Sequence, residues 1–185
     1  MSWIQVIPEE EAKGDLAEAY RQVVAQRGKV SRIMAIHSLA PKAMAAHLDL
    51  YMKIMFEKGG LSRAEREMIA VAVSVENGCR YCTVHHAAAL AAWWKDAERV
   101  ERLRRAPDTA ELSPREKRIT EYALQLTRAP TEVSEEDVAR LREVGLSEAE
   151  ILQANLVTSY FNFVNRVAEG LGVEPTEEES AGYRY

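Results

Sequence analysis

Cysteine is scarce in this sequence, and long apolar runs and basic clusters are missing from it. Its 185 residues include 2 cysteines, and no stretch approaches the roughly 18 consecutive apolar residues of a membrane-spanning helix. No run of lysine and arginine marks a surface for lipid or nucleic acid, and the net charge is -5. We therefore expect no membrane and no nucleic acid among the partners of this protein.

The N-terminus also lacks the features of an export signal. MSWIQVIPEEEAKGD has neither a basic n-region nor an apolar h-region, so we expect no signal peptide and a cytoplasmic location. Glutathione and thioredoxin keep cytoplasmic thiols reduced. A close cysteine pair in that compartment is more often catalytic or metal-binding than structural.

The composition allows one sizeable core. The chain is 47% hydrophobic and 29% charged, and its length suits a single domain over residues 1–185. WIQVI, near the start, is the one strand-like segment, and one strand makes no sheet. We therefore interpret residues 1–7 as an extended arm. The polar residues 174–185, EPTEEESAGYRY, are interpreted as a tail.

The apolar periodicity is helical nearly throughout, which predicts an all-α fold. Pro8 and three glutamates are expected to open a first helix that ends at Gly28. Pro41 opens a second helix, which Gly59 and Gly60 end. The other predicted helices cover residues 62–76, 79–94, 95–105, 114–128, 135–144 and 148–171.

The helix that follows Gly60 has a strong start signal and an apolar body. Ser62 is followed three residues later by Glu65, which is the spacing of a capping box. From Met68 to Val75 the helix is almost entirely apolar, so we expect it to be buried on all sides. Such burial needs more cover than a chain of this length easily supplies, and we therefore expect a homo-oligomer.

A repeated segment links two of the predicted helices. LSPREKRI, from Leu112, resembles LSRAEREMI, from Leu61, about 51 residues earlier. The similarity suggests duplication of a helical unit. The second copy contains no cysteine, so any thiol chemistry belongs to the first.

The two cysteines lie in ENGCRYCTVHHAAAL, and this Cys-x-x-Cys has several interpretations. Haem attachment requires histidine directly after the second cysteine, where this chain has Thr83. A thioredoxin fold requires a preceding strand, and here a helix precedes the motif. A zinc site needs four ligands, and Cys79, Cys82 and one of His85 or His86 give three. Simple packing of two cysteines in a helical core is the remaining alternative.

A redox pair has a physical basis at this position. Unpaired N–H groups at a helix N-terminus stabilise a thiolate and lower the pKa of a cysteine. Cys79 and Cys82 share a helical face, and His86, four residues after Cys82, lies on it too. His85 is rotated by about 100° and fits less well. Glu67 shares a stripe with apolar residues, so we expect either a buried carboxylate that needs a partner or a surface residue of the first turn.

These residues match a known pattern. Glu67, Cys79, Cys82 and His86 form E-x11-C-x-x-C-x3-H, which resembles the motif of AhpD-like alkylhydroperoxidases in the carboxymuconolactone decarboxylase superfamily. YFNFVNRVAEGLGVE and SWIQVIPEEEA resemble its branch of peroxidase-related proteins. The likeness covers most of the chain. It implies an all-helical AhpD-like bundle that assembles into homo-oligomers.

The resemblance also implies a thiol-dependent peroxidase with defined roles. Cys82 attacks the peroxide oxygen and becomes a sulfenic acid, and Cys79 resolves it into a disulfide. His86 and Glu67 move protons between the thiols and solvent. The partners implied are a small-molecule peroxide and a dithiol electron donor, such as lipoamide on a partner enzyme. We expect no bound cofactor and no metal ion.

Two departures keep alternatives open. AhpD itself has a histidine between its cysteines, where this chain has Tyr81, which weakens the implied proton relay unless His85 compensates. Carboxymuconolactone decarboxylases share the fold without the cysteine pair, so the fold alone does not establish a peroxidase. The alternatives are a decarboxylase-like lyase using Glu67 and His86, and a non-enzymatic redox-sensing module.

Other polar residues receive structural assignments. Asn162, Asn165 and Arg166 lie on one face of an apolar helix, where they either line a pocket or, as we expect, form hydrogen bonds between helices. His37 and His47 are also assigned structural roles.

Overall fold

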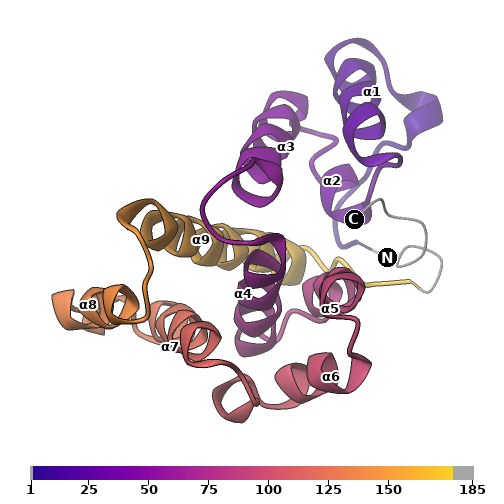
Figure 1. The fold of residues 1–185 in the computed structure, drawn as a ribbon. Coiled ribbons are helices and arrows are strands. Elements are labelled where there is room, and N and C mark those ends of the chain that lie inside the picture. Colours follow the sequence, from indigo (N-terminus) through magenta and orange to yellow (C-terminus); the bar gives the residue numbers. More distant parts are fainter. Residues whose placement is uncertain (1, 177–185) are drawn as a thin grey trace.

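The computed structural model describes residues 2–176, and Figure 1 shows that their regular elements are helices. In chain order these are η1 (Glu9–Glu11), α1 (Gly14–Arg27), α2 (Arg32–Ala35), α3 (Pro41–Phe56), α4 (Arg63–Glu76), α5 (Arg80–Trp94), α6 (Ala97–Arg105), η2 (Pro107–Thr109), α7 (Pro114–Arg128), η3 (Pro130–Glu132), α8 (Glu135–Glu143) and α9 (Glu148–Gly170). The predicted all-α fold is thereby confirmed. None of the described helices is long and apolar enough to cross a membrane.

Most helix boundaries lie close to their predicted positions, and two predicted starts are wrong. α7 covers the predicted residues 114–128. Pro8 precedes only the 3-10 turn η1, and α1 begins at Gly14. α6 begins after Lys95 and Asp96, because Lys95 takes a left-handed conformation (φ 54°) that ends α5 and Asp96 caps the next helix.

α4 is the central helix of the fold. It packs against α5, α7 and α9, which surround it in Figure 1. Every residue from Met68 to Ser74 is 0% exposed, which confirms the predicted burial for this part of the helix, whereas Val75 is only partly buried. The chain's own helices supply this cover, so the expectation that a neighbouring subunit must supply it is wrong.

A smaller apolar cluster joins α1 to α3. Its buried members are Leu16, Ala19, Tyr20, Val23, Met34, Met44 and Leu48. The cluster holds α1, α2 and α3 together at one end of the molecule (Figure 1). It thereby positions Arg27, the last residue of α1, and α2 beside the cavity described below.

The repeated motif noted in the sequence occurs three times and starts three helices. LSRAE, LSPRE and LSEAE precede or open α4, α7 and α9, and each forms a complete capping box. The serine side chain accepts from the amide of the glutamate three residues on, and that glutamate accepts from the amide of the serine. Two donors at each helix start are satisfied in this way.

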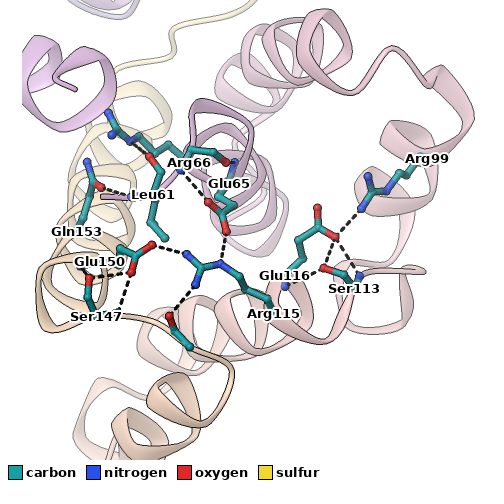
Figure 2. Close-up of polar contacts among 12 residues, drawn as sticks. Leu61, Glu65, Arg66, Arg99, Ser113, Arg115, Glu116, Ser147, Glu150 and Gln153 are labelled. Atoms are coloured by element: carbon teal, nitrogen blue, oxygen red, sulfur yellow. Dashed lines mark hydrogen bonds and ion pairs between the residues drawn. The ribbon is translucent and has the colours of Figure 1, made fainter. Parts of the chain in front are cut away.

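One arginine connects two of these helix starts. Figure 2 shows Arg115, in the first turn of α7, between Glu65 of α4 and Glu150 of α9. Its Nε lies 2.7 Å from Glu65 Oε1, and its Nη2 lies 2.6 Å from Glu150 Oε1. Both carboxylates belong to capping boxes, so each one binds its own helix start and the arginine together. The three helices therefore begin at the same end of the bundle.

The N-terminal segment binds its own chain and is not a strand. The Trp3 amide donates to the Leu171 carbonyl at 2.9 Å, and the Ile7 amide donates to Ser38 Oγ at 3.0 Å. Gly172 has a φ of +67°, and a Cβ on it would lie 2.4 Å from the Trp3 indole nitrogen. The predicted extended arm therefore docks beside the end of α9. Of the predicted tail, residues 177–185 lie outside the described residues.

Replacing Arg115 with Met keeps an apolar stem of similar length and removes both interhelical ion pairs. We expect the free energy of unfolding to fall by about 1–2 kcal/mol, because the pairs are partly buried and share one network. Urea denaturation at pH 7 measures this change. Arg21→Met removes an exposed pair with Glu18 and serves as the control, with almost no expected effect. Equal stabilities of the two variants would contradict the role assigned to Arg115.

Candidate functional site

A cavity of about 80 Å³ lies where α4, α5 and α9 meet the N-terminal helices. Its lining is mostly apolar and aromatic, with a few polar and charged groups. The lining residues are Arg27, Ser31, Ile33, Met34, Tyr51, Arg63, Glu67, Tyr81, Cys82, His85, His86, Ala89, Tyr160, Phe161 and Val164. Three of the four residues of the sequence motif, Glu67, Cys82 and His86, therefore face one space.

Glu67 is wholly buried, which settles its two alternatives in favour of the interior. Its Oε2 lies 2.7 Å from Nδ1 of His86 on α5. Its Oε1 accepts from Nε and Nη2 of Arg63 at 2.8 and 2.5 Å. Arg63 also donates to the Met55 carbonyl and lies over the Phe56 ring. The carboxylate thus has partners on both oxygens, as a buried charge requires.

These partners fix the protonation of the pair. Burial alone raises the pKa of Glu67, but the His86 ring and the Arg63 guanidinium outweigh it and hold this pKa below its usual value. Glu67 is therefore an acceptor, and His86 must donate Nδ1–H to it. Nε2 of a neutral His86 is then the ring atom that accepts a proton from the cavity.

The two cysteines occupy the turn that starts α5. Gly78, with a φ of +68°, allows the chain to turn after α4. Cys79 is the N-cap residue, and its Sγ accepts from the Cys82 amide at 3.5 Å. Both thiols are free, and both residues are buried. Cys82 lines the cavity, whereas Cys79 lies behind it at 0% exposure.

The electrostatics of Cys82 differ from the sequence prediction. A hydrogen bond with Cys79, followed by burial, raises the pKa of Cys82 well above its usual value. The predicted lowering of the pKa by the helix N-terminus is therefore wrong for Cys82, because two buried thiols compete for one charge. A thiol of this kind must give its proton to a base before it attacks as a thiolate.

Asn165, on α9, opposes part of this effect. Its amide hydrogen bond lowers the pKa of Cys82. Its Nδ2 also donates to Ser74 Oγ at 3.1 Å, and its Oδ1 accepts from Asn77 Nδ2 at 3.0 Å. The expected hydrogen bonding between helices is confirmed for Asn165, since Asn77 follows α4. The contact with Cys82 has no signal in the sequence, because it joins residues far apart in the chain.

Arg63 is a second site residue that the sequence interpretation missed. It precedes Glu67 by four residues on α4, and this spacing of opposite charges was a usable signal.

Tyr81, which lies between the two cysteines in the sequence, also lines the cavity. Its ring lies 4.2 Å from that of His85, whose Nδ1 is 2.8 Å from the Tyr81 carbonyl. His85 also lines the cavity. Across residues 2–176, no three His, Cys, Asp or Glu side chains group closely enough to hold a metal ion.

The all-helical fold, with a Cys-x-x-Cys pair at the start of α5, agrees with the class that the sequence resembles, the AhpD-like proteins. Comparison with known proteins supports the same class. The sequence profile described as "Carboxymuconolactone decarboxylase family" matches residues 41–125. The chain is 26% identical over 144 residues to the uncharacterized protein YdfG of Bacillus subtilis (strain 168). The matched region covers 77% of this chain and 96% of YdfG.

Two crystal structures share nearly the whole fold. One is an uncharacterized peroxidase-related protein with an "alkylhydroperoxidase AhpD core" from Ralstonia eutropha JMP134, at 27% identity and a TM-score of 0.87, covering 99% of this chain and 98% of that one. The other is a peroxidase-related protein from Silicibacter sp. TM1040, at 29% identity and a TM-score of 0.87, covering 99% and 96%. The family profile and these two structures support assignment of the chain to the AhpD and carboxymuconolactone decarboxylase superfamily.

Arg63→Met leaves the buried Glu67 carboxylate with one partner fewer, and we expect the free energy of unfolding at pH 7 to fall by about 3 kcal/mol. The folded-state pKa of Glu67 lies below 4.5, so its stabilising effect is complete above that value and is lost as the pH falls through the folded-state value. The difference in the free energy of unfolding between Arg63→Met and the wild type should therefore become smaller in acid.

Urea denaturation between pH 7 and pH 3 measures this difference. Arg118→Met, which breaks a half-exposed pair with Glu121, is the control and should change stability little at any pH. If this difference in the free energy of unfolding is small at pH 7, or becomes larger in acid, Arg63 does not stabilise the Glu67 carboxylate.

Proposed function

We propose that this protein is a thiol-dependent peroxidase that reduces hydroperoxides through Cys82 and Cys79. One observation carries the proposal. Cys82 lines the cavity that holds the Glu67–His86 pair, and Cys79 Sγ accepts a hydrogen bond from the Cys82 amide. A nucleophile and a proton-handling pair thereby line one small space, with a second thiol next to the nucleophile. Peroxidase-related proteins that share the fold over its full length add support.

The proposed cycle conserves atoms and electrons. The Cys82 thiolate attacks the outer oxygen of a hydroperoxide ROOH, the O–O bond breaks, and the leaving RO⁻ takes a proton to become ROH. Cys82 is now a sulfenic acid. The Cys79 sulfur then attacks the Cys82 sulfur, the S–O bond breaks, and water leaves as the disulfide forms. Two electrons and two protons from an external dithiol restore both thiols.

The cavity lining supports an organic hydroperoxide as substrate. Apolar and aromatic side chains, among them Ile33, Met34, Phe161 and Val164, make up most of its wall. Such a wall favours an alkyl or aryl group by burying its apolar surface. The proposed reductant is a dithiol, such as lipoamide on a partner protein, and the chemistry needs no bound metal or cofactor.

Peroxide consumption tests this proposal. Cumene hydroperoxide is supplied with dihydrolipoamide, thioredoxin or glutathione, and many turnovers are expected with at least one of them. Turnover of a lactone substrate by the Cys79→Ser/Cys82→Ser double variant would instead support the lyase. One stoichiometric oxidation without sustained consumption would support the redox-sensing module.

Single cysteine variants are expected to separate the two roles. Cys82→Ser should abolish the reaction with peroxide, because its sulfur faces the cavity. Cys79→Ser should react once and stop at a sulfenic acid on Cys82, because no resolving thiol remains. Dimedone labelling read by mass spectrometry measures both outcomes. Labelling of Cys79 in Cys82→Ser, with none on Cys82 in Cys79→Ser, would show that the roles are reversed.

We further propose that the protein works as a homo-oligomer, in keeping with the apolar face of α9. Leu152, Leu156 and Phe163 recur at helical spacing and are 59%, 41% and 48% exposed. Exposed apolar groups on one face are typical of an interface. Light scattering at micromolar concentration is expected to give a multiple of the 20.8 kDa chain mass. Leu156→Glu should shift the mass towards that of the monomer, whereas a wild-type mass of 20.8 kDa would refute the oligomer.

A further inference from the structure

A second hydrogen-bonded chain, separate from the Glu67–His86 pair, also reaches the cavity. Tyr160 Oη, on α9, lies 2.6 Å from Nε2 of His47 on α3. Nδ1 of His47 lies 3.3 Å from Nε2 of His37. Nδ1 of His37 lies 3.0 Å from the Ile33 carbonyl oxygen. The two histidines that the sequence left as structural are therefore linked to a cavity residue.

The carbonyl at one end fixes the direction of every proton in this chain. A carbonyl oxygen only accepts, so His37 Nδ1 carries a hydrogen and its Nε2, when neutral, accepts. His47 must then donate through Nδ1, and its Nε2 accepts the Tyr160 hydroxyl hydrogen. Tyr160 thus donates away from the cavity and presents its oxygen to the cavity as an acceptor.

The groups around the chain keep it neutral. Burial raises the pKa of Tyr160 well above its usual value, with Tyr51 and Cys82 adding to the rise and Arg27 opposing it. Burial, together with His37, lowers the pKa of His47 to about 4. Both are therefore uncharged at neutral pH, as the deduced hydrogen directions require. Arg63 and Glu67 line the same cavity from α4.

The chain also runs from the interior towards the surface. Tyr160 and His47 are both buried at 6% exposure, whereas His37 is only partly buried. Tyr160 lines the same small cavity as Cys82. A proton accepted at the tyrosine oxygen therefore has a hydrogen-bonded route to His37, the partly exposed end of the chain.

We propose that Tyr160, His47 and His37 form a proton path that removes the thiol proton of Cys82, an inference that rests on the proposed function. The S–H bond of Cys82 breaks and its proton bonds to Tyr160 Oη. The Tyr160 proton moves to His47 Nε2, and the His47 Nδ1 proton moves to His37 Nε2. The products are a Cys82 thiolate and a His37 imidazolium, which returns its proton to water.

This path and the Glu67–His86 pair serve different steps. A proton that His86 takes up from solvent at Nε2 stays in the cavity, beside the ionised Glu67 carboxylate, where the leaving RO⁻ needs one. A proton that enters the Tyr160 chain leaves the cavity. Cys82 needs such an outlet, since the neighbouring Cys79 and burial both oppose its ionisation.

The test measures alkylation of Cys82 by iodoacetamide across pH 6–10, in a Cys79→Ser background that leaves one thiol. Tyr160→Phe removes the hydroxyl and keeps the ring, and His47→Gln keeps hydrogen-bonding groups but passes no proton. Tyr122→Phe is the matched control, because Tyr122 is also 6% exposed and its hydroxyl has one hydrogen bond, from Asn155 at 2.8 Å. Thermal unfolding verifies that each variant folds.

We expect Tyr160→Phe and His47→Gln each to slow alkylation at pH 7 by about a hundredfold, the low end for a positioned base. The double variant should lose no more, because the groups act as one path. The deficit should close at high pH, where hydroxide ionises the thiol directly, and Tyr122→Phe should behave as the background.

Two results would overturn the path. If Cys82 is alkylated as fast in Tyr160→Phe as in Tyr122→Phe, no such path exists. If alkylation is slow in Tyr160→Phe but unchanged in His47→Gln, the tyrosine acts alone and the path is refuted. No peroxide is present in the assay, so a failure of the peroxidase proposal appears separately, as absent hydroperoxide turnover in the wild type.

Discussion

The ion pair between Arg63 and the buried Glu67 is the interaction on which the site depends. A carboxylate without exposed surface is tolerated inside a protein only when its charge is compensated and its oxygens are hydrogen-bonded. Arg63 meets this requirement from the same helix, and His86 meets it from the next one. The pair thus determines both the charge of the carboxylate and the tautomer of the histidine. It does so before any substrate enters, so the site needs no rearrangement to handle a proton.

The arrangement divides the cavity wall by chemical task. α4 supplies fixed charge through Arg63 and Glu67, the start of α5 supplies sulfur through Cys82, and α9 supplies a neutral hydroxyl through Tyr160. α5 also supplies His86, and the apolar residues between these groups limit water. The short distance between charge and thiol matters because a low-dielectric surrounding strengthens both attraction and repulsion.

Local spacing predicted what local structure governs. The capping box at Ser62 and the cysteine pair at a helix start follow from near neighbours in the sequence, whereas the same spacing left the burial of Glu67 open. The hydrogen bond between His47 and Tyr160 joins residues 113 positions apart, and no periodicity in one sequence indicates it. The pKa direction at Cys82 was mispredicted for a similar reason. The helix terminus is visible in the sequence, whereas the degree of burial that opposes it is a property of the packed molecule.

The shared arginine at the starts of α4, α7 and α9 has a consequence for precision. Arg115 holds Glu65, which is two residues from Glu67, so this ion pair and the buried carboxylate lie within one helical turn of each other. A turn rises about 5.4 Å, and a slip of α4 by that amount would carry Glu67 out of reach of His86. The ion pairs of Arg115 therefore fix the position of α4 along its own axis relative to α7 and α9. Displacements of helices elsewhere in the bundle therefore shift Glu67 little along this axis. Its carboxylate stays within reach of His86.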